Sequence, residues 1–129
     1  MRTLACVVAA TAALAAIPAA AGPDLECNGS SQIEISECVN TALEAVDKAV
    51  EVSLGFAMGA AGELDSVTGR ASSVPALEAA QAAWSAYRDA HCEHVGATYG
   101  GGSGTGIAIA SCRVMLGRDR VEVLLNLAN

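Results

Sequence analysis

Apolar residues recur at helical spacing in three stretches of the chain. The first stretch, near residues 33–55, carries Ile35, Val39, Ala42, Leu43, Val46, Val50 and Leu54. The second, near residues 75–97, carries Leu77, Ala80, Trp84, Tyr87, His91 and Val95. The third, near residues 107–127, carries Cys112, Met115, Leu116, Val123, Leu124 and Leu127. Because a spacing of three to four residues places side chains on one helix face, we predict three amphipathic helices.

Capping residues and glycines mark the ends of these stretches. Ser31 and Glu34 have the spacing of a capping box before the first helix, and Ser72 or Ser73 precedes Pro75 before the second. Glycines between residues 100 and 106 end the second helix, whereas residues 55–69 are either a fraying helix end or a loop. No convincing strand alternation is visible. We predict a small all-α domain, a helical hairpin plus a third helix, stapled by disulfides.

The N-terminal residues have the anatomy of a secretory signal peptide. Arg2 supplies the positive charge, residues 4–17 are apolar, and Ala19-Ala20-Ala21 offers a cleavage site before Gly22. The alternative is a retained anchor, but the apolar run is shorter than the ~20 residues that span a membrane. We therefore expect a cleaved signal at residues 1–21, a single domain at residues 22–129, no membrane span, and a location in the periplasm or outside the cell.

The charge balance is acidic. The chain has 14 Asp and Glu residues against 7 Lys and Arg residues, and loss of Arg2 with the signal would leave a net charge near minus eight. Such a chain repels nucleic acid and anionic lipid and favours a basic partner. The alternative reading is that the charge serves solubility alone.

The cysteine count changes when the signal is removed. Cys6 lies within the signal, and Cys27, Cys38, Cys92 and Cys112 remain. An even set in an oxidising compartment predicts two disulfides, and the count alone allows three connectivities.

Residue patterns for catalysis or cofactor binding are weak. His91-Cys92-Glu93-His94 contains zinc-ligand residue types but lacks the usual ligand spacing, and Cys92 is needed for a disulfide. The glycine run lacks the Gly-Lys-Ser/Thr ending of a phosphate loop, and no nucleophile elbow is present. We predict a protein that is not an enzyme and binds no metal or cofactor; an enzyme whose site escapes recognition is the alternative.

One stretch carries a specific motif. It reads Ala80-Gln81-x-x-Trp84-x-x-Tyr87-Arg88-Asp89-x-x-Cys92, followed by Tyr99-Gly100-Gly101-Gly102-Ser103, Ala110-Ser111-Cys112 and Arg118-x-Arg120. Together with the early cysteine pair it resembles the LprI-type lysozyme inhibitor family of small secreted bacterial proteins, from Cys27 to about Leu127. The resemblance implies binding and blocking of an animal-type lysozyme, which is a basic protein. An envelope protein-interaction domain without inhibitory activity is the alternative.

We predict one disulfide pairing among the three. A Cys27–Cys38 bond would close a short loop across the entry to the first helix. A Cys92–Cys112 bond would straddle the glycine run and tie the second helix to the third. We predict this pairing.

The motif residues also have a structural interpretation. Gln81, Trp84, Arg88 and Cys92 share one helix face, so Trp84 is expected in the core. Arg88 is expected to pair with a carboxylate of the first helix or with carbonyls of a neighbour, and Arg120 to play the same part on the third helix. We expect the whole set to be structural: Gln81, Trp84, Tyr87, Arg88, Asp89, Arg118 and Arg120.

The glycine run is the candidate for partner binding. By analogy with inhibitors of other folds, which push a small loop into the lysozyme cleft, we select Tyr99, Gly100, Gly101, Gly102 and Ser103. Glycines allow close backbone approach, tyrosine supplies rigid contact area, and serine can donate a hydrogen bond to a carboxylate. The alternative is a flexible linker between two helices. The sequence leaves the oligomeric state open.

Overall fold

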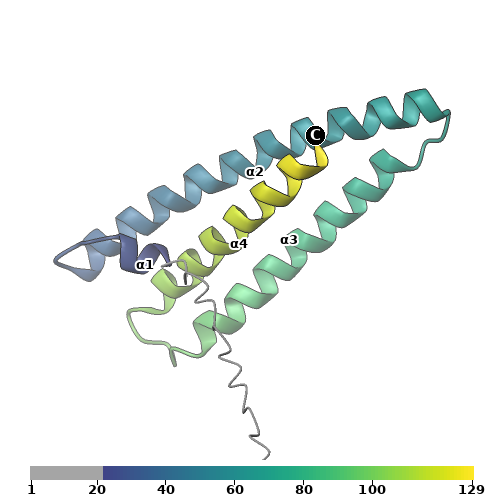
Figure 1. The fold of residues 1–129 in the computed structure, drawn as a ribbon. Coiled ribbons are helices and arrows are strands. Elements are labelled where there is room, and N and C mark those ends of the chain that lie inside the picture. The colour runs from purple at the N-terminus through teal and green to yellow at the C-terminus, as the bar shows by residue number, and fades with distance from the viewer. Residues whose placement is uncertain (1–21) are drawn as a thin grey trace, which may run out of the picture.

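The computed structural model describes residues 22–129 and is all-α over that range. Its helices are α1 (Pro23–Glu26), α2 (Gln32–Thr68), α3 (Ser73–Ala97) and α4 (Thr105–Leu127). The long helices α2 and α3 form a hairpin, and α4 lies between them and ends before the tip of the hairpin (Figure 1). The predicted class, a helical hairpin plus a third helix, is confirmed. The predicted signal peptide at residues 1–21 lies outside the described residues.

Helix α2 is longer than the sequence pattern indicated. We expected it to end near residue 55, but it continues to Thr68 and ends at Gly69, which has a left-handed φ of 67°. The small residues of this segment allow close helix packing: Ala57 and Ala61 are buried although the segment is rich in glycine. Packing of these alanines therefore offsets the low helix propensity of the glycines in the same segment.

The two capping predictions had different outcomes. At the start of α2 the capping box is present, since Glu34 N–H donates to Ser31 Oγ and Ser31 N–H donates to Glu34 Oε2. The Glu34 carboxylate also accepts hydrogen bonds from the Ser30 hydroxyl and the Ser30 backbone N–H. Together with the bond from the Ser31 backbone N–H, these bonds hold the pKa of Glu34 below its ordinary value. At the start of α3, Ser72 is the N-cap residue, but its side chain makes no capping bond.

The carboxylate of Asp65, near the end of α2, caps α3 instead. It accepts from the backbone N–H groups of Val74 at 3.0 Å, Ser73 at 2.8 Å and Ser72 at 3.2 Å. These bonds, led by that of Val74, lower the pKa of Asp65 below its ordinary value of 3.8. Because each bond crosses the α2–α3 turn, Asp65 fixes the hairpin as well as the helix start.

Replacing Asp65 with alanine is expected to lower the melting temperature at neutral pH and to have little effect in acid. The folded-state pKa lies below the unfolded value, so the stabilisation is present above pH 3.8 and is lost as pH falls through the folded pKa. Thermal unfolding of both proteins from pH 7 to pH 2 measures the difference. Glu63→Ala, which removes an exposed carboxylate from the same helix, is the control. A difference that persists unchanged at pH 2 would contradict the role of the Asp65 carboxylate.

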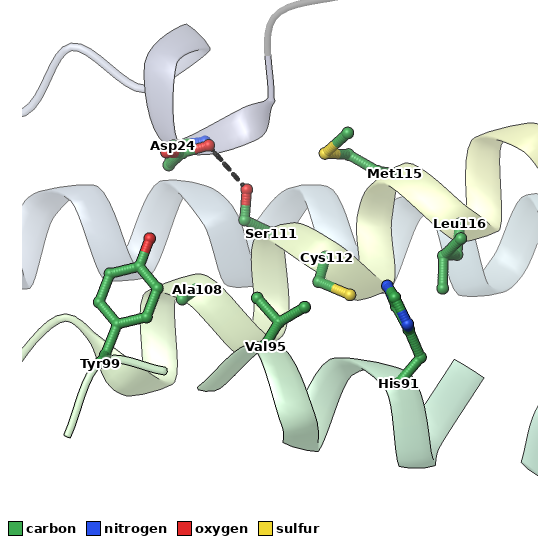
Figure 2. Close-up of a pocket in the computed structure, with 9 residues that line it drawn as sticks. All are labelled: Asp24, His91, Val95, Tyr99, Ala108, Ser111, Cys112, Met115 and Leu116. Carbon is green, nitrogen blue, oxygen red and sulfur yellow. Dashed lines mark hydrogen bonds between the residues drawn. The ribbon is translucent and has the colours of Figure 1, made fainter. Parts of the chain in front are cut away.

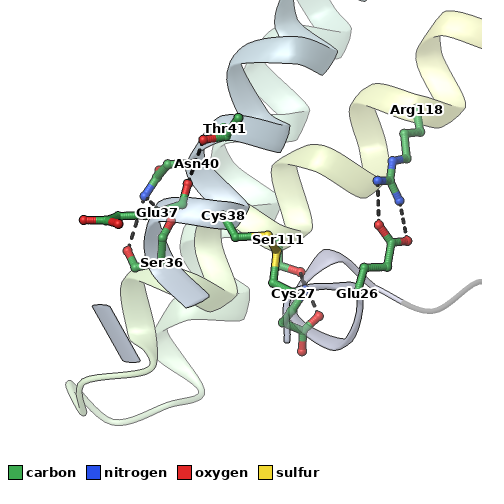
Figure 3. Close-up of a disulfide and its surroundings, with 10 residues drawn as sticks. Glu26, Cys27, Ser36, Glu37, Cys38, Asn40, Thr41, Ser111 and Arg118 are labelled. Atoms are coloured by element: carbon green, nitrogen blue, oxygen red, sulfur yellow. Dashed lines mark hydrogen bonds and ion pairs between the residues drawn. A yellow bond between two sulfur atoms is a disulfide. The ribbon is translucent and has the colours of Figure 1, made fainter. Parts of the chain in front are cut away.

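Two disulfides lie towards the end of the bundle away from the α2–α3 turn. Cys27–Cys38 joins the segment after α1 to α2, and Cys92–Cys112 joins α3 to α4, as predicted. Figure 3 shows the first of these bonds beside a bidentate ion pair between Glu26 and Arg118, with both N···O distances 2.8 Å. The hydrogen bond from Arg118 is the main cause of a lowered pKa at Glu26. Covalent and ionic contacts therefore hold the short α1 in place.

Candidate partner-binding site

Trp84 lies between two arginines at the meeting point of α3 and α4. The guanidinium carbons of Arg88 and Arg120 are 5.2 Å and 5.6 Å from the centre of its ring. The indole is half-buried and packs against a core cluster that includes Leu124 of α4. Arg120 also donates from Nε to Gln81 Oε1 at 3.0 Å, and burial lowers its pKa. These motif side chains therefore contact one another and the core.

Arg88 connects all three long helices. Its Nη2 donates to Asp47 Oδ1 of α2 at 2.7 Å, and its Nε and Nη2 donate to the carbonyl of Arg113 in α4 at 3.0 Å and 2.8 Å. Both contacts that the sequence suggested as alternatives are therefore present at once. Arg113 in turn lies 3.2 Å from Glu93 and 3.4 Å from Asp89 of α3. The charged residues of the motif thus make their contacts between helices of this chain.

The outer edge of α3 presents an aromatic row. Tyr87, His91 and Val95 follow one another at intervals of four residues along α3, and Tyr99 lies in the turn just after the helix ends at Ala97. We expected Tyr87 and His91 on the same apolar stripe as Trp84, but both are exposed, and their rings stack 5.3 Å apart. The stripe is therefore divided, because Trp84 packs against the core cluster whereas Tyr87 and His91 are exposed.

A pocket of about 280 Å³ opens between α3 and α4 beside this row. Figure 2 shows its lining, which comprises Asp24, His91, Val95, Tyr99, Ala108, Ser111, Cys112, Met115 and Leu116. Most of these side chains are apolar. At the rim the Asp24 carboxylate accepts a hydrogen bond from the Ser111 hydroxyl at 2.9 Å. The pocket therefore combines apolar walls with one carboxylate.

Tyr99 lines both this pocket and a second hollow of about 240 Å³. The second hollow is lined by Asp24, Gln32, Ile35, Tyr99, Gly104, Ile107 and Ala108. Tyr99 is 54% exposed, and its ring packs over the backbone of Gly104. A half-exposed tyrosine that lines two hollows resembles the aromatic anchors that concentrate binding energy at protein interfaces.

The glycine loop after Tyr99 is shaped by tight turns. Gly100 and Gly101 have φ values of 64° and 81°, in the left-handed region that favours glycine. Gly102 N–H donates to the carbonyl of Tyr99 at 3.3 Å, and Thr105 N–H donates to the carbonyl of Gly102 at 3.0 Å. Ser103 is exposed at the edge of the loop. The candidate residues therefore lie together at one end of the bundle.

Sequence reasoning placed the loop but missed the pocket beside it. Asp24 and Met115 line the pocket although neither was selected from the sequence. The available signal was the four-residue spacing of Tyr87, His91 and Val95, which marks the edge of α3 that borders the pocket. Within residues 22–129, no group of three or more His, Cys, Asp or Glu side chains is placed to hold a metal ion. No helix in that range is both long and apolar enough to cross a membrane.

These features define a small, disulfide-stapled helical domain with a candidate binding surface at its cross-linked end. The family model described as "Lysozyme inhibitor LprI" matches residues 26–124, and the chain belongs to this family. Searches of curated proteins and of solved structures found no match. The disulfides and the family fit a protein that acts outside the cytoplasm.

Proposed function

We propose that this protein binds an animal-type lysozyme and inhibits it, and that the surface around Tyr99 makes the contact. Membership of the lysozyme inhibitor family is the observation that carries the proposal. The acidic charge supports it, because the chain has a formal net charge of −7 and lysozymes of this type are basic. Opposite charges mainly raise the association rate, while the contact residues set the lifetime of the complex.

The geometry of the loop suits insertion into a cleft. Gly100, Gly101 and Gly102 present backbone without side chains, so the loop is narrow where it turns. Tyr99 at its base offers a rigid aromatic surface with only two side-chain torsions to order. The exposed Ser103 hydroxyl can donate a hydrogen bond to one of the carboxylates that catalyse glycoside hydrolysis. In this arrangement the loop would occupy the space of the substrate.

Replacing Tyr99 and Ser103 together with alanine is expected to abolish or strongly weaken inhibition. The change removes the aromatic contact and the hydroxyl but no residue of the described core. Lysozyme activity on bacterial cell walls, measured at increasing inhibitor concentration, gives the apparent Kd. The control is Phe56→Ala with Ser66→Ala, which removes an exposed aromatic ring and an exposed hydroxyl from the second half of α2. Circular dichroism checks that both variants keep their helicity.

The salt dependence of the unmodified protein provides a second readout. At physiological salt the Debye length is ~8 Å, so binding should be tighter at low salt and weaken as salt rises. Full inhibition by the Tyr99 and Ser103 variant would exclude the loop and move the site to an acidic helix face. Absence of binding to every lysozyme tested at low salt would contradict the proposed function and leave an envelope interaction domain without inhibitory activity.

A further inference from the structure

We propose that the pocket between α3 and α4 receives an arginine side chain of the partner protein. This inference deepens the proposed function and rests on it for the identity of the partner. It assigns a specific role to Asp24, which lines the pocket, and to the apolar side chains opposite. The argument has three parts: the apolar walls, the position of the carboxylate, and the charge of the surroundings.

The walls suit an aliphatic stem. Val95, Met115 and Leu116 line the same space together with the small side chain of Ala108 (Figure 2). Long basic side chains bury their methylene groups along apolar surface and keep the charged end near polar groups. An arginine that enters from the exposed side can therefore remove its stem from water against these residues.

The carboxylate of Asp24 is held in position by Ser111. Ser111 Oγ donates to Asp24 Oδ1 at 2.9 Å and accepts from the Asp24 backbone N–H at 3.3 Å. Within residues 22–129, Asp24 makes no ion pair, whereas Glu26, on the same short helix, is occupied by Arg118. Asp24 is therefore an oriented acceptor with capacity for a cation, and α1 cannot turn it away without breaking the bonds to Ser111.

The chemistry favours arginine over the other side chains that carry charge. An acidic group would meet the Asp24 carboxylate and the overall negative charge of the chain. Among cations, guanidinium is planar, less strongly hydrated than ammonium, and able to stack on an aromatic ring while it bonds a carboxylate. Tyr99 and His91 provide aromatic rings in the lining of the same pocket. The pocket thus suits arginine, a side chain that basic proteins carry and that is enriched at protein interfaces.

A titration followed by nuclear magnetic resonance tests this proposal without a partner protein. The protein is purified after expression of the full 129-residue chain, and the probe is N-acetyl-arginine N-methylamide. We expect shifts of the Val95, Ala108, Met115 and Leu116 signals, with a Kd in the millimolar range. The matching citrulline amide has almost the same shape but no charge, and should bind about fivefold more weakly.

Two variants with the same change in charge test whether Asp24 is the carboxylate that binds the arginine probe. Asp24→Asn keeps an oxygen for Ser111 and should weaken arginine binding about fivefold, to the level of the citrulline probe. Glu44→Gln removes an exposed carboxylate from α2, which contributes no residue to the pocket, and should leave binding unchanged. Thermal unfolding confirms that both variants are folded.

The outcomes separate this inference from the proposed function. The arginine pocket would be overturned if the arginine and citrulline probes bound equally, or if Asp24→Asn and Glu44→Gln weakened binding equally. It would also be overturned if the signals of the pocket residues did not shift. Inhibition of lysozyme without these shifts would leave the proposed function standing and remove only the pocket. Asp24-dependent binding of the arginine probe by a protein that inhibits no lysozyme would keep the pocket and require a different basic partner.

Discussion

Replacing Gly117 with valine is expected to produce the largest loss of stability of any single substitution discussed for this chain. A Cβ atom at Gly117 would lie 2.9 Å and 3.1 Å from the two methyl carbons of Val46, and 3.3 Å from Arg88 Nη2. Val46 is buried and β-branched, so it has little rotational freedom with which to move aside. Helices α2 and α4 would have to separate, at a cost of about 3 kcal/mol, the upper end of typical overpacking costs.

The same substitution at Gly59 is the control. Gly59 lies within α2, is exposed, and has no atom within 4 Å of the position that a Cβ would take. Valine is a slightly better helix former than glycine, so Gly59→Val should change stability by less than about 1 kcal/mol. Urea unfolding at equilibrium measures both variants. Equal unfolding free energies for the two variants would show that α2 and α4 do not approach closely at Gly117.

Several features could be predicted because their signals are local. The apolar spacing placed α3 and α4 within a few residues of their observed ends, and Ser31 with Glu34 marked the start of α2. The predicted cysteine pairing, in which each bond joins segments that are consecutive along the chain, is confirmed. Local periodicity and capping do not depend on the rest of the fold.

Other features depend on contacts between distant segments. The second half of α2 is rich in glycine and alanine, and its helix is stabilised by packing that no local pattern reveals. The cap of α3 comes from Asp65, eight residues before Ser73, rather than from the serines beside it. The pocket is assembled from α1, α3 and α4, and its carboxylate comes from a four-residue helix that the sequence did not predict.

The family motif divides between contacts inside the helix bundle and the candidate binding surface. Gln81, Trp84 and Arg88 make contacts within the helix bundle, whereas Tyr99 and Asp24 face the two hollows at the cross-linked end. The first part of the motif therefore supports the fold, whereas its Tyr99–Ser103 part lies at the surface proposed to meet a partner. Inhibition needs its own test at the Tyr99 surface.

Removing the Cys92–Cys112 disulfide by changing both cysteines to alanine should destabilise the domain by about 3 kcal/mol or more. The bond closes a loop with a sequence separation of 20, which restricts the unfolded chain by about that amount. Cys92 is fully buried, so the loss of its sulfur also leaves a small cavity. For a chain of this size, the melting temperature should fall by roughly 10 °C or more.

Cys27→Ala with Cys38→Ala is the matched comparison. This bond closes a shorter loop, with a sequence separation of 11, and Cys38 is exposed, so its removal should cost less. Thermal unfolding of both variants under identical oxidising conditions gives the order of the two effects. The Cys92–Cys112 variant should also lose binding of the arginine probe, because Cys112 lines the pocket between the two helices that the bond joins. A larger loss of stability from the Cys27–Cys38 variant would show that the attachment of α1, rather than the α3–α4 link, dominates the stability of the domain.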